Sequence, residues 1–172
     1  AASMNGMPHG GDGIPGIGFS GHFCVHFFRS TTHRSDHPDL AHQLMVHKAA
    51  GQLEPFFAQA APHELAQIFL EAMNHHETGI LRQVAAGLPK DQLDAFVLET
   101  ESIQSVRYAK PEKPGQTDNA SNEDAAELGT AEIGMQVIVY HNNRSEQAAF
   151  YKFLFQRDSV HSPWRMVDIA TE

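Results

Sequence analysis

Three segments of the sequence decide the fold: EIGMQVIVYH at residues 132–141, AAFYKFLFQ at 148–156 and WRMVDI at 164–169. Each segment is rich in β-branched and aromatic residues and has the length of a strand. The pair Asn142-Asn143 is typical of a tight turn between the first two segments, and a polar loop joins the last two. The sequence therefore predicts an antiparallel sheet, and its aromatic residues are expected to lie in the core: Phe150, Phe153, Phe155 and Trp164.

A fourth strand is predicted over Ser102–Lys110, where the pattern changes from a helical to an alternating period. The segment Pro111–Gly129 is rich in Pro, Gly, Asn, Asp and Glu, which is typical of a long loop. Upstream, apolar residues recur on one helical face. The first predicted helix begins near Leu40 and ends at Gly51. Four further helices are predicted over Leu53–Ala60, Pro62–Met73, Ile80–Ala86 and Asp91–Leu98. Helices followed by an antiparallel sheet indicate an α+β fold.

The composition excludes several classes of protein. A length of 172 residues corresponds to one domain, or to one domain and part of another. The 12 Lys and Arg residues stand against 21 Asp and Glu residues, a net charge of −9, so we expect no nucleic-acid partner. We also expect no transmembrane segment, because every apolar run is shorter than about 18 residues. The first residues lack the basic and apolar regions of a signal peptide, and we expect the chain to begin inside a longer protein.

Candidate chemistry is concentrated in the first fifty residues, which hold seven of the twelve histidines and the single cysteine, Cys24. A loop with six glycines covers residues 10–21 and leads into a predicted strand, Gly21–Phe28. This region predicts a partial β structure. A strand places alternate residues on opposite faces. One face would carry His22, Cys24 and His26, and the other Phe23, Val25 and Phe27.

These residues allow three interpretations of Cys24, which has no second cysteine with which to form an internal disulfide. The thiol is buried among phenylalanines, or it is a nucleophile whose proton a histidine accepts, or it lies in a metal site. His9 precedes it by fifteen residues, and the glycine-rich loop would return His9 to the thiol. The metal alternative is a zinc site, with the ligands His22, His26, His33 and His37. Without that metal, we expect solvent-exposed side chains at His33, His37, His42 and His47.

The segments Met7–Gly10 and Gly21–His26 together resemble the signature of the L,D-transpeptidase catalytic domain of bacterial cell-wall enzymes. In that family an upstream His-Gly precedes a Ser-His-Gly-Cys-(Ile/Val)-Arg segment. The resemblance implies that Cys24 is the acyl-accepting nucleophile, that His9 is its base and that His22 orients the thiol. Two positions depart from the pattern, since Phe23 replaces a glycine and His26 replaces an arginine.

The same resemblance implies a substrate, a reaction and a location. Peptidoglycan stem peptides would bind near Gly10, Gly21 and His26, and no metal or cofactor would be required. The thiolate would attack an L,D-peptide bond, and a second amine or water would resolve the thioester. The location would be extracytoplasmic, at the bacterial cell wall.

The resemblance divides the chain into residues 1–51, the end of an L,D-transpeptidase-like catalytic region, and residues 52–172, an accessory α+β domain. The second part resembles the cystatin-like and nuclear-transport-factor-like domains, in which helices pack on a curved antiparallel sheet. The alternative function is a non-catalytic module that binds peptidoglycan or another ligand, with a structural N-terminal segment. The oligomeric state is left open.

Overall fold

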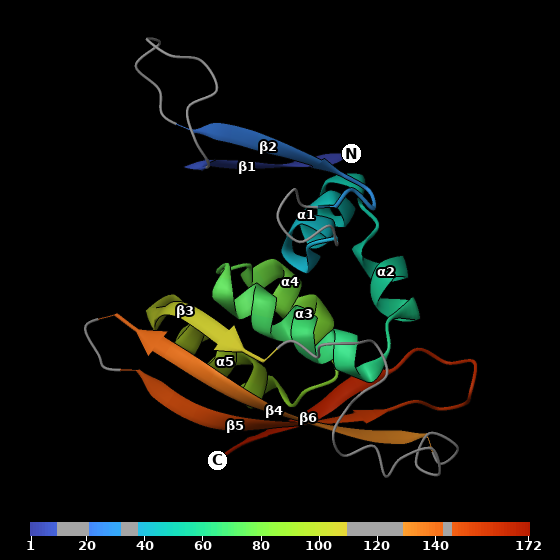
Figure 1. The fold of residues 1–172 in the computed structure, drawn as a ribbon. Coiled ribbons are helices and arrows are strands. Elements are labelled where there is room, and N and C mark those ends of the chain that lie inside the picture. The colour runs from blue at the N-terminus through green and yellow to red at the C-terminus, as the bar shows by residue number, and fades with distance from the viewer. Residues whose placement is uncertain (10–20, 32–37, 110–128, 143–145) are drawn as a thin grey trace. The chain divides into compact units, whose positions relative to one another are not determined.

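The computed structural model describes residues 1–9, 21–31, 38–109, 129–142 and 146–172 (Figure 1). The chain divides into two compact units, an N-terminal unit, Ala1–Leu53, and a C-terminal unit, Glu54–Glu172. Nearly all of the predicted loop at 111–129, and the predicted turn residue Asn143, lie outside the described residues.

The N-terminal unit contains a two-stranded antiparallel sheet and one helix. Strand β1 (Ala2–His9) pairs with β2 (His22–Phe27), and helix α1 (Leu40–Ala50) follows. The Asp39 carboxylate accepts a hydrogen bond from the His42 backbone N–H at 3.2 Å, which caps the first turn of α1. At the other end Gly51 has a φ of 66°, a left-handed conformation that ends the helix as expected.

The C-terminal unit contains the predicted helices and the predicted sheet. All four strands are antiparallel to their neighbours and lie in the order β3-β4-β5-β6. The helices are α2 (Leu53–Gln59), α3 (Pro62–Asn74), α4 (Thr78–Val84) and α5 (Lys90–Ser102). The strands are β3 (Ile103–Tyr108), β4 (Thr130–His141), β5 (Gln147–Gln156) and β6 (Arg165–Thr171). This architecture confirms the α+β prediction.

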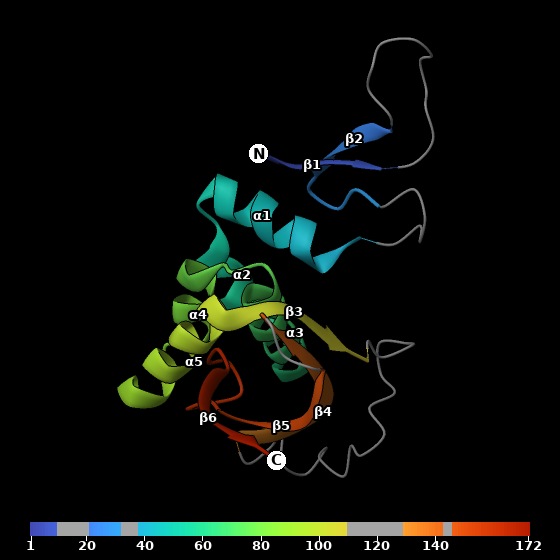
Figure 2. The same ribbon diagram turned by 90° about the vertical axis from the view of Figure 1, so that its left-hand side faces the viewer.

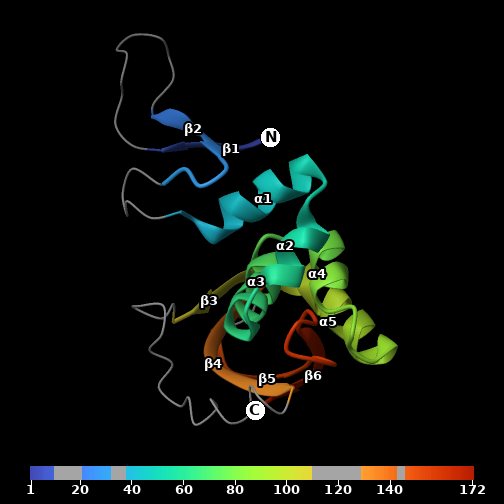
Figure 3. The ribbon, with the colours of Figure 1, turned by 90° about the vertical axis from the view of Figure 1, so that its right-hand side faces the viewer.

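The sheet of the C-terminal unit is strongly curved, and α3 lies inside the arc of β4, β5 and β6 (Figure 2, Figure 3). The ring of Phe69 on α3 meets Phe96 and Phe153 edge to face, at centroid distances of 5.2 and 5.6 Å. Phe153 and Phe155 are completely buried, as predicted. These rings form the centre of a continuous aromatic core.

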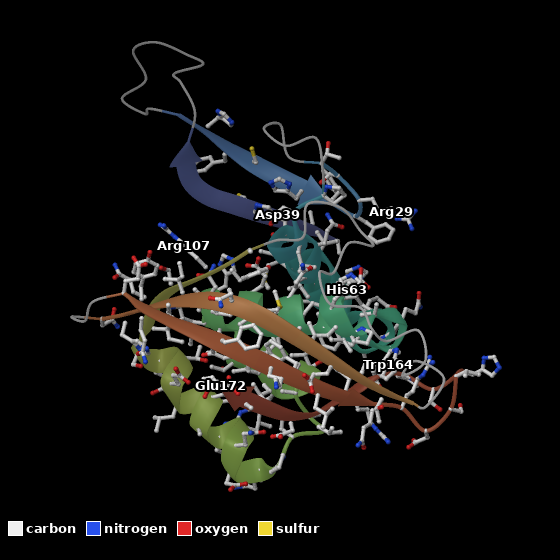
Figure 4. The ribbon with its side chains drawn as sticks, turned by 60° about the horizontal axis from the view of Figure 1, so that its bottom comes forward. Arg29, Asp39, His63, Arg107, Trp164 and Glu172 are labelled. Atoms are coloured by element: carbon white, nitrogen blue, oxygen red, sulfur yellow. The ribbon has the colours of Figure 1, made fainter. Side chains whose placement is uncertain are left out.

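Two predicted core residues lie instead at the margin of this core. Phe150 is only partly buried, and its ring occupies the space over Gly134, where a Cβ atom would come within 2.5 Å of it. Trp164 is also partly exposed, and the Arg157 guanidinium lies 4.4 Å from the centre of its ring. Figure 4 shows Trp164 at one end of the sheet and Arg107 at the other. Strand alternation explains Phe150, because Tyr151 and Phe153 occupy the opposite face.

Polar contacts join β3 to α3 at the edge of the sheet. The Tyr108 hydroxyl donates to Glu71 Oε1 at 2.7 Å, and the Val106 backbone N–H donates to Asn74 Oδ1 at 2.8 Å. Glu71 is buried, so this hydrogen bond supplies a partner for a carboxylate removed from water. These two hydrogen bonds therefore fix the position of β3 against α3.

Candidate functional site

The two faces of the β1–β2 sheet have different environments. On one face His26 and Ser3 form a cross-strand pair, and both side chains are buried. Cys24 belongs to the same face of β2 and is half-buried. On the other face Met4 pairs with Val25, and both are more than half exposed. The thiol is therefore on the face that also carries the buried histidine.

The phenylalanines near Cys24 do not form a buried pocket around it. Phe23 and Phe27 belong to the opposite face of β2, and both are more than half exposed. Phe28, which follows the strand, is exposed to a similar extent. The interpretation of Cys24 as a thiol packed among these rings is therefore wrong.

The backbone register brings His9 back to the region of Cys24. His9 pairs with His22, and Asn5 pairs with Cys24 itself. The register shifts between these two pairs, so β1 spans more residues than β2 over the same interval. Paired residues of an antiparallel ladder have Cα atoms about 4.5–5.5 Å apart. The His9 backbone therefore lies opposite His22, two residues before Cys24 on β2.

Of the two glycines predicted to bind substrate, the structure describes Gly21 and not Gly10. Gly21 immediately precedes β2 and has a φ of 99°, which other residues rarely adopt. Gly10 lies outside the described residues. Phe23, which stands where the family pattern has glycine, lies within β2 and has no positive φ. The strand conformation thus requires no glycine at position 23.

His26 is held beneath α1. Its ring stacks on that of His42, with the ring centroids 3.7 Å apart and the planes 10° from parallel. The expectation that His42 is solvent-exposed is therefore wrong. His47 is also half-buried, in edge contact with Phe28, and burial lowers the pKa of its imidazole. His42 and His47 flank the buried positions of α1, which are Gln43, Leu44 and Val46.

Gln43, which the sequence did not single out, fixes the end of β2. Its Oε1 accepts from the Arg29 backbone N–H at 2.8 Å, and its Nε2 donates to the Phe27 carbonyl at 3.2 Å. Gln43 is buried, and Arg29 takes a φ of 60°. Both backbone groups are thereby satisfied where the chain leaves the strand.

The predicted zinc ligands cannot be assembled from the residues that the structure describes. Within that part of the chain, no group of three or more His, Cys, Asp or Glu side chains is close enough to hold a metal ion. Two of the four predicted ligands, His33 and His37, lie outside it. His26, a third, is occupied in its stack with His42.

A second group of titratable side chains, missed in the sequence, lies in the C-terminal unit. Burial raises the pKa of the Glu99 carboxyl, and nearby His141 opposes this by favouring the charged form. Burial, together with the Glu99 charge, raises the pKa of the Tyr151 hydroxyl. These three residues come from α5, β4 and β5. They are far apart in the sequence, so no local motif predicts that they lie together.

The raised pKa of Glu99 predicts how stability depends on pH. The folded chain binds the Glu99 proton more tightly than the unfolded chain does. The contribution of this proton to the stability of the fold is therefore complete at a pH below 4.5, the ordinary pKa of a glutamate. It is lost as the pH rises through the folded value. We expect Glu99→Gln to increase the urea midpoint at neutral pH and to change it little at acid pH. Glu101→Gln, at an exposed position of the same helix, is the control, and equal midpoints for wild type and Glu99→Gln at neutral pH would contradict the expectation.

Among the described helices, none is both long and apolar enough to span a membrane. In comparisons with known proteins, no family model matches this chain, and no curated protein or solved structure matches it.

Proposed function

We propose that the N-terminal unit carries a cysteine acyl-transfer site of L,D-transpeptidase type. The observation that supports this most is the register of the β1–β2 sheet, in which His9 pairs with His22, two residues before Cys24. A nucleophilic thiol needs a base close by, and the chain returns a histidine to this place after an eleven-residue gap in the described structure. Cys24 is also partly exposed, so a reagent can reach it.

In this proposal His9 accepts the Cys24 proton and the thiolate attacks the carbonyl carbon of an L,D-peptide bond in a stem tetrapeptide. The C–N bond breaks, and the terminal D-amino acid leaves with the proton returned by the imidazole. The acyl group remains on sulfur as a thioester. A second stem-peptide amine, or water, then attacks the thioester and regenerates the thiol.

His22 and His26 receive different roles. His22 is exposed and adjoins the thiol on the same face, so it orients the thiol and contacts substrate. His26 is buried and stacked on His42, which favours a positioning role over direct binding of a substrate carboxylate. The arginine of the family pattern is therefore not replaced by an equivalent fixed cation at this position.

Peptidoglycan stem peptides are the proposed partner, and an extracytoplasmic location at the bacterial cell wall follows from that substrate. The C-terminal unit is proposed to be an accessory domain. The competing proposal is a non-catalytic binding module in which the N-terminal unit is structural. It predicts an unreactive thiol, which a chemical probe distinguishes.

Alkylation of Cys24 by iodoacetamide at neutral pH tests the proposal. We expect the folded chain to react faster than the urea-unfolded chain, because a neighbouring base increases the thiolate population. His9→Ala should slow the folded reaction about tenfold or more. Mass spectrometry of the intact chain gives the rates, since the single cysteine is the only thiol.

His161→Ala is the matched control, because it removes an exposed imidazole from the C-terminal unit. Its rate should equal that of wild type. If the folded thiol reacts no faster than the unfolded one, or if His9→Ala has no effect, the acyl-transfer proposal fails and the binding module takes its place.

A further inference from the structure

The β1–β2 sheet has its polar residues on the covered side and its apolar residues on the exposed side. Helix α1 contacts both strands and lies along one side of the sheet (Figure 3). The stack of His42 on His26 identifies this as the side that carries Ser3, Cys24 and His26. An antiparallel sheet that is covered on one side normally turns apolar residues toward the cover and polar residues toward water. The reversed pattern indicates a second contact on the other side of the sheet.

The exposed side consists of two cross-strand pairs and one further phenylalanine. Val25 lies opposite Met4, and Phe27 lies opposite Ala2. Phe23 belongs to the same side of β2, because alternate residues of a strand share a side. The four large side chains are each 51–66% exposed, and Ala2 is exposed as well. These five residues form an apolar face, and none of them is polar or charged.

The apolar face is large enough for a weak dimer. A phenylalanine has a surface of about 150–250 Å², so the exposed parts of Phe23 and Phe27 together provide roughly 200 Å². With Met4, Val25 and Ala2 the face amounts to about 500 Å². Two copies that pack face to face would bury about 1,000 Å² in total, the lower end of the range for specific interfaces. We therefore expect a dissociation constant in the micromolar range.

The apolar face is complementary to a second copy of itself. Sheets that pack face to face lie about 10 Å apart, and their side chains interdigitate. Phe27 is beside Ala2, so a large side chain adjoins a small one on this face. A twofold axis brings the same surface together from both copies, and the ring of one copy then fills the space over the alanine of the other.

Charge favours a second copy over a lipid surface. Residues 1–53 hold three Lys and Arg residues and three Asp and Glu residues, so the N-terminal unit has no net charge. Two such units approach each other without net repulsion. The rest of the chain carries the whole net charge of −9, which opposes binding to the anionic surface of a membrane.

We propose that the apolar face is the interface between two copies of this chain in solution. The two sheets pack face to face about a twofold axis, with the Met4–Val25 pair at the centre. Cys24 belongs to the other side of β2, so the second copy does not cover the thiol. The association is therefore independent of acyl transfer at Cys24.

Sedimentation velocity on the full chain tests the proposal, at about 2 to about 500 μM and with a reductant that prevents a disulfide at Cys24. We expect a reversible change from the monomer mass of 19.0 kDa to twice that mass. Val25→Lys should raise the dissociation constant about tenfold or more, because it places a charge at the centre of the interface. Met4→Lys, on the other strand, should have the same effect. A salt concentration of about 0.5 M should leave the wild-type dimer intact, since its interface contains no ion pair.

Leu98→Lys is the matched control, because it makes the same kind of change at a side chain that is 69% exposed on α5. Its dissociation constant should stay within about twofold of wild type. Circular dichroism establishes that each variant is folded. The proposal is overturned if the wild-type chain stays monomeric, if salt dissociates the dimer, or if Leu98→Lys weakens association as much as Val25→Lys. A monomer that floats with vesicles of phosphatidylcholine and phosphatidylglycerol, when Val25→Lys does not, would assign the apolar face to a lipid surface instead.

Discussion

Under the proposed function, replacing Cys24 with serine is expected to reduce acyl transfer by about a thousandfold or more. A serine hydroxyl is a far weaker nucleophile than a thiolate unless a complete activating system surrounds it. The substitution changes one atom at a half-buried position, so we expect the fold to be retained. The measurement is release of the terminal D-amino acid from a synthetic stem tetrapeptide, with the thioester detected by the intact mass.

Val25→Ala is the control for this experiment, because Val25 is next to the cysteine but belongs to the exposed opposite face. Its transfer rate should stay within a few-fold of wild type. A serine variant as active as wild type would exclude Cys24 as the nucleophile. A wild-type chain that forms no thioester would contradict the proposed function as a whole.

Replacing Phe153 with alanine is expected to lower the free energy of unfolding of the C-terminal unit by about 3–5 kcal/mol. The ring is completely buried and contacts Phe69, Tyr151 and Phe155, so its removal leaves a cavity that its neighbours cannot fill. Typical domains are stable by only about 5–15 kcal/mol, so this loss is a large fraction of the total. Urea unfolding followed by Trp164 fluorescence measures it, because this is the single tryptophan of the chain.

Leu98→Ala provides the comparison, since Leu98 is 69% exposed on α5. Its effect should be within about 0.5 kcal/mol. A loss below about 1 kcal/mol for Phe153→Ala would mean that the ring does not carry the core.

The C-terminal unit could be predicted from the sequence because each of its elements has a local pattern. The strands β4, β5 and β6 combine branched and aromatic residues with turn residues between them. Helix α5 was predicted to end at Leu98 and continues to Ser102. The four additional residues contain Thr100, which is completely buried, and its hydroxyl donates to the Phe96 carbonyl at 2.7 Å, so this polar group has a partner within the helix.

Strand β1 could not be predicted, because the sequence of Ala2–His9 contains glycine, proline and small polar residues without alternation. It is a strand because β2 supplies partners for its backbone groups. The stack of His26 on His42 likewise depends on a contact between residues that are distant in the sequence. These residues are sixteen positions apart, and neither has a local signal of burial.

The titratable group of Glu99, His141 and Tyr151 was missed for a related reason. Glu99 has the pattern of an ordinary polar position on a surface helix, and the other two residues lie on strands at least forty residues away. The only signal in the sequence is that Glu99 shares a helical face with Phe96, which is buried.

The contact of Gln43 with β2 has a consequence for how freely the sequence can change. Its amide binds the carbonyl of residue 27 and the N–H of residue 29, which every amino acid except proline can supply. Side chains at these two positions can therefore be exchanged widely, and glycine or asparagine at 29 would relieve the positive φ. Position 43 cannot be exchanged in this way, because asparagine is one methylene shorter and glutamate cannot donate. We therefore expect substitutions at residues 27 and 29 to be tolerated and substitutions at residue 43 to weaken the contact.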